Sequence, residues 1–280
     1  MYVYKPFRFF LVVFAATWAF WITAAVLGRI SGLEYASTAL MLLGLLVPAT
    51  VALVMVLTSK NAALKQDLKA KLVSGSRIRV SVVLISIAVF IIVIAVSIVA
   101  STLFGQSWSQ FSLVEGFSFS IGGVPTLLVL VLTAFLEELG WRGYGQDALA
   151  STMTWFRAAC IFAILWSVWH LPLFFIPDTY QQGLLQESPW FMVNFLVSIV
   201  PLGFLFAWVY AKSNRSILAC MFFHFTVNFL QEQIAMTQIT KCVETVVLLV
   251  VVGIVVVCDK KLFFSTDHIG NLLNEPQPSD

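Results

Sequence analysis

The sequence predicts an all-α membrane protein, a polytopic bundle of about eight transmembrane helices. Of its 280 residues, 60% are hydrophobic and only 11% are charged, and the mean hydropathy is +0.95. A soluble domain of this length carries about 25% charged residues, so the deficit indicates a chain that exposes apolar side chains to lipid. The apolar residues also gather in long runs, several of them close to the ~20 residues that a helix needs to cross a bilayer.

Eight apolar segments are predicted to span the membrane. They are 9–27, 40–57, 80–104, a segment that starts near Gly122, 158–176, 189–211, 216–230 and 243–257. The first is too long for the core of a signal peptide, so we expect it to be retained. The third is rich in Val and Ile, but a run of bilayer length predicts a helix despite its β-branched residues. We expect one transmembrane domain over 1–264 and a polar, disordered tail over 265–280.

The basic residues predict the orientation of the chain. The segment 59–79 carries six lysines and arginines against a single acid, Asp67. Its part 62–73 fits either an amphipathic helix on an anionic membrane surface or a solvated loop. With the N-terminus inside and eight spans, all lysines and arginines except Arg29 and Lys241 lie on the inner side. This bias satisfies the positive-inside rule, so we predict that both termini are cytoplasmic.

Charge and cysteine usage exclude other classes of protein. The formal net charge of +2 is too small to indicate a nucleic-acid partner. The four cysteines lie far apart without a CxxC pair, so we expect small buried side chains at Cys160, Cys220, Cys242 and Cys258. Four further polar residues fall in loops or the tail and are expected to be solvated: Glu34, Glu115, Asp147 and His268. Asn194, within a span, is expected to bond a neighbouring helix.

The segment 136–143 places two carboxylates and a guanidinium, Glu137, Glu138 and Arg142, at the end of an apolar run. Each charge at membrane depth costs roughly 2.5–3.5 kcal/mol, so such residues indicate a functional site by default. Glu138 and Arg142 are four residues apart and share a helix face, as an ion pair should. Glu137 is then left to share a proton with a histidine or a water. A carboxylate in contact with water can act as a general base.

Three other polar residues are expected at similar depth. From the helical rise of 1.5 Å per residue, we place His224 roughly 12 Å, and Asn228 and His170 roughly 18 Å, from the inner ends of their spans. Glu137 is expected about 8 Å from the inner face of a ~30 Å core. The four can therefore form one site in the cytoplasmic half of the bilayer. Pro172 should open the helix beside His170.

The same residues form three spaced motifs. They are Glu137-Glu138-x-x-x-Arg142, an aromatic-x-x-x-His motif from Trp166 to His170, and His224-x-x-x-Asn228. In this order, on successive predicted helices, they resemble the CAAX protease and bacteriocin-processing (CPBP) family, which includes the type II CAAX prenyl endopeptidases. The resemblance covers about 122–231. Trp166 departs from the pattern, since the family usually has Phe there, and this places the shape of the substrate groove in question.

The resemblance implies an eight-helix intramembrane endopeptidase without a covalent intermediate. Glu137 with His170 would activate water, His224 and Asn228 would form an oxyanion hole, and Glu138 with Arg142 would support the site. No cofactor is implied. The expected partners are membrane lipid and a peptide or lipidated protein, including prenylated proteins that lose their C-terminal tripeptide. In a prokaryotic host the protein would lie in the cell membrane.

Three alternatives remain open at this stage. The first is a protease that holds Zn²⁺ on Glu137, His170 and His224, although no HExxH motif supports it. The second is a scaffold or immunity-type membrane protein that keeps these residues for folding. The third is a proton-coupled transporter with a Glu137–His170 relay, which predicts inverted repeats that the sequence does not display.

Overall fold

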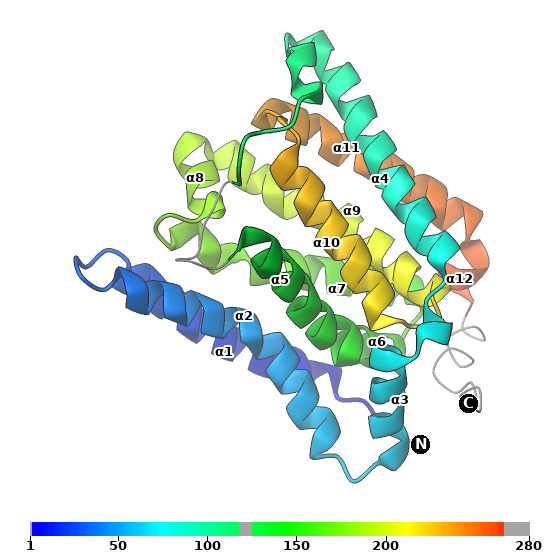
Figure 1. The fold of residues 1–280 in the computed structure, drawn as a ribbon. Helices are drawn as coiled ribbons and strands as arrows, with labels where there is room; N and C mark the ends of the chain where they lie inside the picture. The colour runs from blue at the N-terminus through cyan, green and yellow to red at the C-terminus, as the bar shows by residue number, and fades with distance from the viewer. Residues whose placement is uncertain (1, 118–124, 266–280) are drawn as a thin grey trace.

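The computed structural model describes residues 2–117 and 125–265, and it consists of helices connected by short turns (Figure 1). The main helices are α1 (Pro6–Leu27), α2 (Glu34–Leu57), α3 (Ala62–Val73), α4 (Val80–Ser101), α5 (Thr126–Gly140), α6 (Gln146–Ala150), α7 (Trp155–Trp169), α8 (Tyr180–Glu187), α9 (Pro189–Lys212), α10 (Ile217–Gln233), α11 (Gln238–Cys258) and α12 (Lys260–Phe264). Within these residues, the only β-type pairing is an isolated bridge between Leu113 and Ile234. The predicted all-α class is confirmed.

Six helical segments are long and apolar enough to cross a membrane: Pro6–Leu27, Glu34–Leu57, Val80–Phe104, Trp155–Phe175, Pro189–Lys212 and Gln238–Cys258. The protein is therefore a multi-pass membrane protein. The other two predicted spans correspond to α5 and α10, which are 15 and 17 residues long. The count of eight spans and the cytoplasmic position of the termini stay predictions. The proposed start of the fourth span and the tail beyond Ser265 lie outside the described residues.

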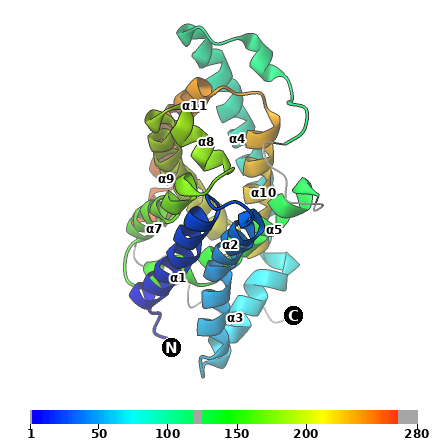
Figure 2. The same cartoon turned by 90° about the vertical axis from the view of Figure 1, so that its left-hand side faces the viewer.

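The helices form a layered bundle with α5 and α10 in its middle. The α1–α2 hairpin packs against α5, α5 packs against α10, and α10 packs against α4 and α9 (Figure 1). Figure 2 views the bundle from the side of α1 and α2, with α7 and α9 beside them. The residues predicted to be functional lie on α5, α7 and α10 or directly after them. These interior helices therefore carry the site, while the remaining helices surround it.

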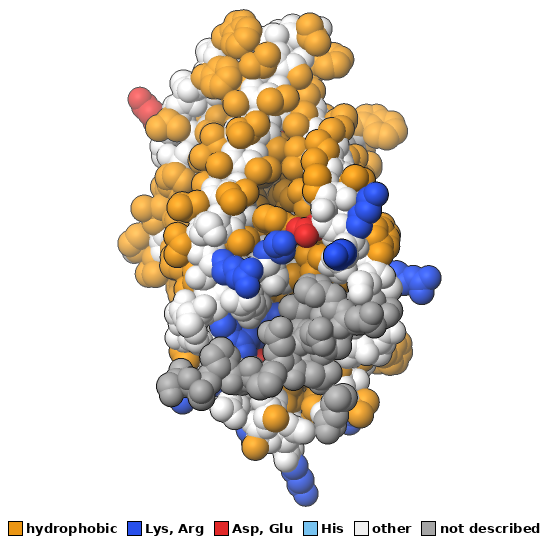
Figure 3. Space-filling model, turned by 90° about the vertical axis from the view of Figure 1, so that its right-hand side faces the viewer, with side chains coloured by type: hydrophobic (Ala, Val, Ile, Leu, Met, Phe, Trp, Pro, Cys, Tyr) orange, Lys and Arg blue, Asp and Glu red, His pale blue; other side chains and the backbone are white. Residues whose placement is uncertain are grey.

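The outer surface is apolar. Figure 3 shows hydrophobic side chains over most of the face formed by α4 and α11, with lysines and arginines gathered toward the lower end. Large aliphatic side chains on these two helices are exposed, among them Ile91, Ile92, Val246, Val250 and Ile254. Exposed apolar area of this extent marks a surface that contacts lipid or another protein. In a chain with six apolar spanning helices, lipid is the natural neighbour.

Two segments outside the predicted spans are helical. After Gly140, α5 continues through one π-helical turn, η4 (Trp141–Gly145), into α6. The alternatives for 62–73 resolve in favour of a helix, α3, capped by the Asn61 side chain. Its Leu64, Leu68 and Lys71 side chains are buried against the bundle, so this face of α3 packs on protein.

Candidate active site

Glu137 lies in the last turn of α5 and is 5% exposed. Its Oε2 accepts hydrogen bonds from two indole N–H groups, Trp166 Nε1 at 2.9 Å and Trp141 Nε1 at 3.3 Å. Trp141 follows Glu137 by four residues, whereas Trp166 reaches it from α7. No hydrogen bond joins Oε1 to another described residue. The carboxylate is therefore held through one oxygen and keeps the other for a further ligand.

His170 follows the last residue of α7, and the chain continues as a 3-10 turn, η5 (Leu171–Phe175). Pro172 was predicted to open the helix here, and the α-helix indeed ends at Trp169. The Nδ1 of His170 lies 2.7 Å from the carbonyl oxygen of Trp166. Since a carbonyl only accepts, Nδ1 carries the hydrogen and Nε2 has the lone pair in the neutral ring. His170 therefore presents a hydrogen-bond acceptor to its surroundings.

His224 of α10 is coupled to the second glutamate. Its Nδ1 lies 2.9 Å from Glu138 Oε1, and Arg142 Nη1 lies 3.1 Å from both oxygens of that carboxylate. The side chains of Glu138 and Arg142 are fully buried. The guanidinium also lies 4.5 Å from the centre of the Phe162 ring and 5.0 Å from that of Phe206. The predicted Glu138–Arg142 ion pair is present, and it holds the ring of His224.

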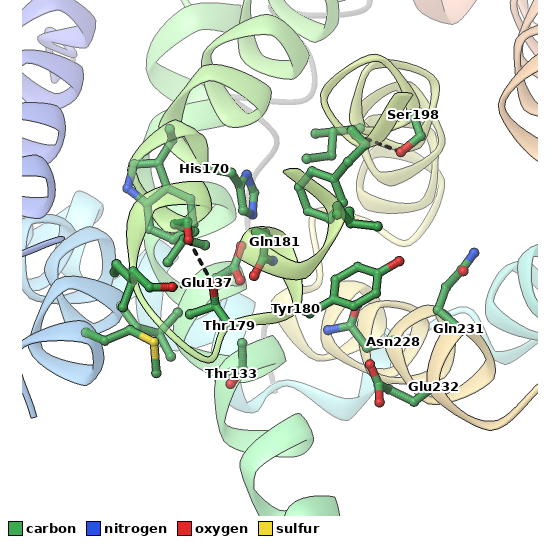
Figure 4. A pocket seen from close by; sticks show the side chains of 18 of the residues that line it. Thr133, Glu137, His170, Thr179, Tyr180, Gln181, Ser198, Asn228, Gln231 and Glu232 are labelled. Atoms are coloured by element: carbon green, nitrogen blue, oxygen red, sulfur yellow. Dashed lines mark hydrogen bonds between the residues drawn. The ribbon is translucent and has the colours of Figure 1, made fainter. Parts of the chain in front are cut away.

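Asn228 lies one helical turn beyond His224 and is half-buried. Among the described residues, its side-chain amide has no hydrogen-bond partner. Glu137, His170, His224 and Asn228 line one cavity of about 490 Å³. Figure 4 shows Glu137 and His170 on one side of this pocket and Asn228, Gln231 and Glu232 on the other. The structure thus brings together the four residues predicted as catalytic, while Glu138 and Arg142 lie behind the wall.

The walls of the pocket differ in polarity. On the side of α2 and α5 there is an aliphatic wall of Met41, Leu42, Leu45, Val129 and Leu130, which lies beside the polar residues Glu34, Ser37, Thr38 and Thr133. Toward the start of α11 they are polar, with Tyr180, Gln231, Gln238, Lys241 and Glu244. Glu244 is buried and accepts hydrogen bonds from the Gln231 amide at 2.7 and 2.9 Å. The cavity is therefore suited to a ligand with both an apolar and a charged part.

Asp147 was predicted to be solvated, and this is wrong. It is fully buried and pairs with Lys71 Nζ at 2.8 Å and with Arg215 Nη2 at 2.5 Å. Burial acts to raise the pKa of this carboxyl, but the two cations outweigh burial and lower the pKa below its usual value. Glu34 and Glu115 are exposed as predicted, and His268 lies outside the described residues. Asn194 accepts a hydrogen bond from Thr245 Oγ1 at 2.8 Å and so joins α9 to α11, as predicted.

Sequence reasoning missed the two indole donors and Glu244. Trp141 carried a usable signal, because residues four apart on a helix face each other. Trp166 was noted only as the aromatic residue of the second motif, and nothing in its spacing shows that its N–H reaches Glu137. Glu244 of α11 accepts a hydrogen bond from Gln231 of α10, the preceding helix. The pattern of polar residues alone does not specify this contact.

Within residues 2–117 and 125–265, no three His, Cys, Asp or Glu side chains are arranged to hold a metal ion. The geometry therefore gives no support to the zinc alternative. Among the four residues predicted as catalytic, Glu137 keeps one oxygen and His170 one nitrogen as free acceptors. These two acceptors lie on the same side of the pocket, and the amide of Asn228 lies on the opposite side (Figure 4).

Carboxylates, histidines and an amide around one pocket of a polytopic helical bundle are the groups that an intramembrane hydrolase requires. Comparison with known proteins specifies the family. Residues 119–230 match the family model of type II CAAX prenyl endopeptidase Rce1-like proteins. The chain is 40% identical to CAAX prenyl protease 2 of Methanococcus maripaludis over 263 residues, covering 94% of this chain and 97% of that protein. The chain therefore belongs to the CAAX prenyl protease family, a family of membrane proteases.

A second relative is more distant. Lysostaphin resistance protein A of Staphylococcus haemolyticus is 28% identical over 123 residues, which cover 44% of this chain and 31% of that protein.

Proposed function

We propose that this protein is an intramembrane endopeptidase that removes the C-terminal tripeptide of prenylated proteins with a water activated by Glu137 and His170. The observation that carries the proposal is the meeting of Glu137, His170, His224 and Asn228 at one cavity, where Glu137 is oriented by two indole donors. The family membership and the name of the M. maripaludis relative support the substrate class. The aliphatic wall of α2 and α5 suits an isoprenoid chain.

The first step is attack by water. The free oxygen of Glu137 and the Nε2 of His170 accept the two water hydrogens, which orients the water oxygen toward a bound peptide carbonyl. As the oxygen bonds to the carbonyl carbon, one proton passes to Glu137. The carbonyl electrons move onto its oxygen and form a tetrahedral oxyanion.

The oxyanion requires donors on the other side of the pocket. The Asn228 amide supplies N–H groups that no described residue occupies. His224 supplies a second donor when it is protonated on both nitrogens, since Nδ1 then donates to Glu138 and Nε2 carries the other hydrogen. Each such donor is worth about 10²–10³ in kcat in enzymes that use oxyanion holes.

The second step is collapse of the intermediate. The proton held by Glu137 passes to the peptide nitrogen, the C–N bond breaks, and the oxyanion electrons reform a carbonyl. The products are a new C-terminal carboxylic acid on the substrate and a tripeptide with a free amine. No side chain is covalently modified, so a single proton relay through Glu137 completes the cycle.

The test is cleavage of a farnesylated CAAX peptide and its unprenylated counterpart by purified protein in detergent. Wild type is expected to cleave the prenylated peptide preferentially, and Glu137→Gln to lose at least about 10³-fold in kcat, because the amide cannot take the proton. Glu187→Gln, which removes the same charge from the end of α8, outside the pocket, is the matched control and should behave as wild type.

Other outcomes would contradict the proposal in distinct ways. Cleavage by Glu137→Gln at the wild-type rate would show that Glu137 is not the general base. Loss of activity with a strong chelator, restored by Zn²⁺, would replace the activated-water scheme with the metal alternative. Failure of wild type to cleave either peptide would contradict the proposed substrate, and unchanged cellular function of Glu137→Gln would then favour a scaffold.

A further inference from the structure

Lys241 occupies a distinctive place at the polar end of the pocket. It is the only lysine or arginine among the described residues that line the cavity, whereas five carboxylates line it: Glu34, Glu137, Asp178, Glu232 and Glu244. Lys241 is half-buried, and no described carboxylate lies within 4.0 Å of its Nζ. Glu244, one turn along α11, is occupied by Gln231 instead. The ammonium therefore makes no direct salt bridge with a described residue, and the carboxylate of Glu244 acts on it only from a longer distance.

The ammonium is held in position by neutral groups. Its Nζ lies 3.1 Å from the Tyr180 hydroxyl and 5.0 Å from the centre of the Tyr180 ring. The same hydroxyl lies 3.3 Å from Gln238 Nε2. An ammonium carries three hydrogens, and only one is used by Tyr180. Two hydrogens remain for an incoming anion. The Lys241 side chain is already held in place by Tyr180 of α8, which is itself bonded to Gln238 of α11.

We propose that Lys241, positioned by Tyr180, binds the terminal carboxylate of the substrate and thereby sets the cleavage site three residues from the C-terminus. This inference rests on the proposed endopeptidase function. The carboxylates that line the pocket would repel the negatively charged terminus of a peptide. This terminus therefore binds at Lys241, the single cation among the described lining residues. Lys241 is then a specificity-determining residue that acts at the far end of the leaving peptide.

The spacing along the helices supports this assignment. The helices α10 and α11 run in opposite directions (Figure 1) and are linked by the Gln231–Glu244 hydrogen bond. From Asn228, Gln231 lies three residues toward the end of α10, and from Glu244, Lys241 lies three residues toward the start of α11. At 1.5 Å per residue, these six residues separate Asn228 from Lys241 by roughly 9 Å along the bundle. Three extended residues span about 10 Å, so a tripeptide bridges the oxyanion donor and the ammonium.

The test compares a farnesylated peptide with a free C-terminal acid to the same peptide with a C-terminal amide. Wild type is expected to prefer the acid by about 10- to 100-fold in kcat/KM, the usual worth of a hydrogen-bonded charge pair. Lys241→Met should cleave the acid about as slowly as wild type cleaves the amide, because its KM for the acid is raised. It should cleave the amide at the wild-type rate. Lys241→Arg should keep most of the preference. Normal cleavage of the amide also shows that the variant is folded.

The matched control is Lys260→Met, which removes an exposed lysine outside the pocket and should keep the full preference for the acid. Equal cleavage of acid and amide by wild type, or an equal loss on both substrates in Lys241→Met, would overturn the assignment. If Glu137-dependent cleavage occurs without this discrimination, only the carboxylate site fails. If no prenylated peptide is cleaved at all, the proposed function fails as well.

Peptide length gives a second measurement. A peptide with one additional residue after the scissile tripeptide places its carboxylate about 3.3–3.6 Å too far along the pocket. Wild type should therefore cleave it about 10-fold more slowly at the original bond, whereas Lys241→Met should treat the two lengths alike. Equal rates for the two lengths in wild type would contradict the proposal that carboxylate binding at Lys241 sets the cleaved bond.

Discussion

At the scale of single residues, the proposed mechanism depends on how the carboxylate of Glu137 is oriented. A general base must keep one oxygen directed at the water through the reaction, and a glutamate side chain has several rotamers to lose. The indoles of Trp166 and Trp141 both bind Oε2 and leave Oε1 free. Trp166, which differs from the usual Phe of the family motif, therefore does more here than form an aromatic wall.

Trp166→Phe tests this positioning role. The ring remains while the 2.9 Å hydrogen bond is lost, and Trp141 still holds Oε2 from 3.3 Å. A hydrogen bond to a charged group is worth about 1.5–3 kcal/mol, and with one donor left we expect a fall in kcat of about 10-fold at nearly unchanged KM. Steady-state cleavage of the farnesylated peptide measures both constants.

The matched control is Trp169→Phe. Trp169 is 1% exposed and its indole N–H has no hydrogen-bond partner among the described residues, so the same substitution removes no bond to Glu137. We expect this variant to keep a near-normal kcat. Equal losses in the two variants would show that indole volume, and not the hydrogen bond to Glu137, supports the activity.

Residues close in sequence were predictable, and residues that meet across helices were only partly so. The Glu138–Arg142 pair and the shared face of His224 and Asn228 follow from spacings of four on a helix. The helical rise of 1.5 Å per residue placed His170 in the same half of the bilayer as Glu137. The bond from Trp166 to Glu137 depends on how α7 and α5 are rotated against each other, which a single sequence does not contain.

At the scale of elements, the close approach of α5 to α2 positions the acidic pair. Gly140, two residues after Glu138, faces Pro48 of α2, and a Cβ at Gly140 would lie 2.5 Å from the Pro48 carbonyl carbon and 2.8 Å from Ala49 N. These are backbone atoms that cannot rotate away. Glycine is thus required for the helices to pack at this distance, as small residues commonly are in membrane bundles.

Gly140→Ala is expected to destabilise the protein by about 1–3 kcal/mol, the usual effect of inserting a methyl group into a packed interface. It should also lower cleavage, because α5 must move away from α2 with Glu137 and Glu138 attached. Thermal unfolding in detergent and the cleavage rate measure the two effects.

Gly253→Ala is the control, since a Cβ there meets nothing within 4 Å and alanine favours the helix by about 0.5–1 kcal/mol. If Gly140→Ala changes neither the stability nor the cleavage rate, α2 can move away from α5 at little cost in free energy.

The sequence predicted the long helices well, and it failed where tertiary contacts decide the backbone. The segment 189–211 was predicted and α9 covers Pro189–Lys212, because apolar length alone identifies such a span. After Gly140, no helix was predicted until residue 158, and Asp147 was expected to be solvated. In the structure, the carbonyls of Arg142 and Gly143 in η4 receive hydrogen bonds from Lys71 Nζ at 3.4 and 3.0 Å, and this contact from α3 supports the continued helix.

At the scale of the whole molecule, a buried charge cluster connects α3, α6 and the turn between α9 and α10 to the active site. It consists of Asp67, Lys71, Asp147 and Arg215. Lys71 bonds the η4 turn that carries Arg142, and Arg142 pairs with Glu138, which binds His224. A continuous chain of polar contacts therefore runs from Lys71 of α3 to His224 at the pocket.

Lys71→Met should break this cluster at a fully buried ion pair. Removing one partner of such a pair costs about 3–5 kcal/mol, and because Arg215 still faces Asp147 we expect about 3 kcal/mol in the free energy of unfolding. Cleavage should fall as η4 loses its support. Lys69→Met, the same substitution on the exposed side of α3, is the control and should change stability by less than about 0.5 kcal/mol.

Acid titration separates this electrostatic role from simple loss of packing. Burial acts to raise the pKa of Asp67, but Lys71 and then Arg215 outweigh it and hold the pKa at about 2, below the usual 3.8. A lowered pKa in the folded state gives stability that is fully present above about pH 4 and is lost as the pH falls toward 2, in total about 2 kcal/mol. In Lys71→Met this pKa returns toward its usual value, so unfolding measured from pH 5 to pH 2 should show a smaller acid-induced loss than in wild type. Parallel curves for the two proteins would mean that Lys71 supports the fold through packing alone.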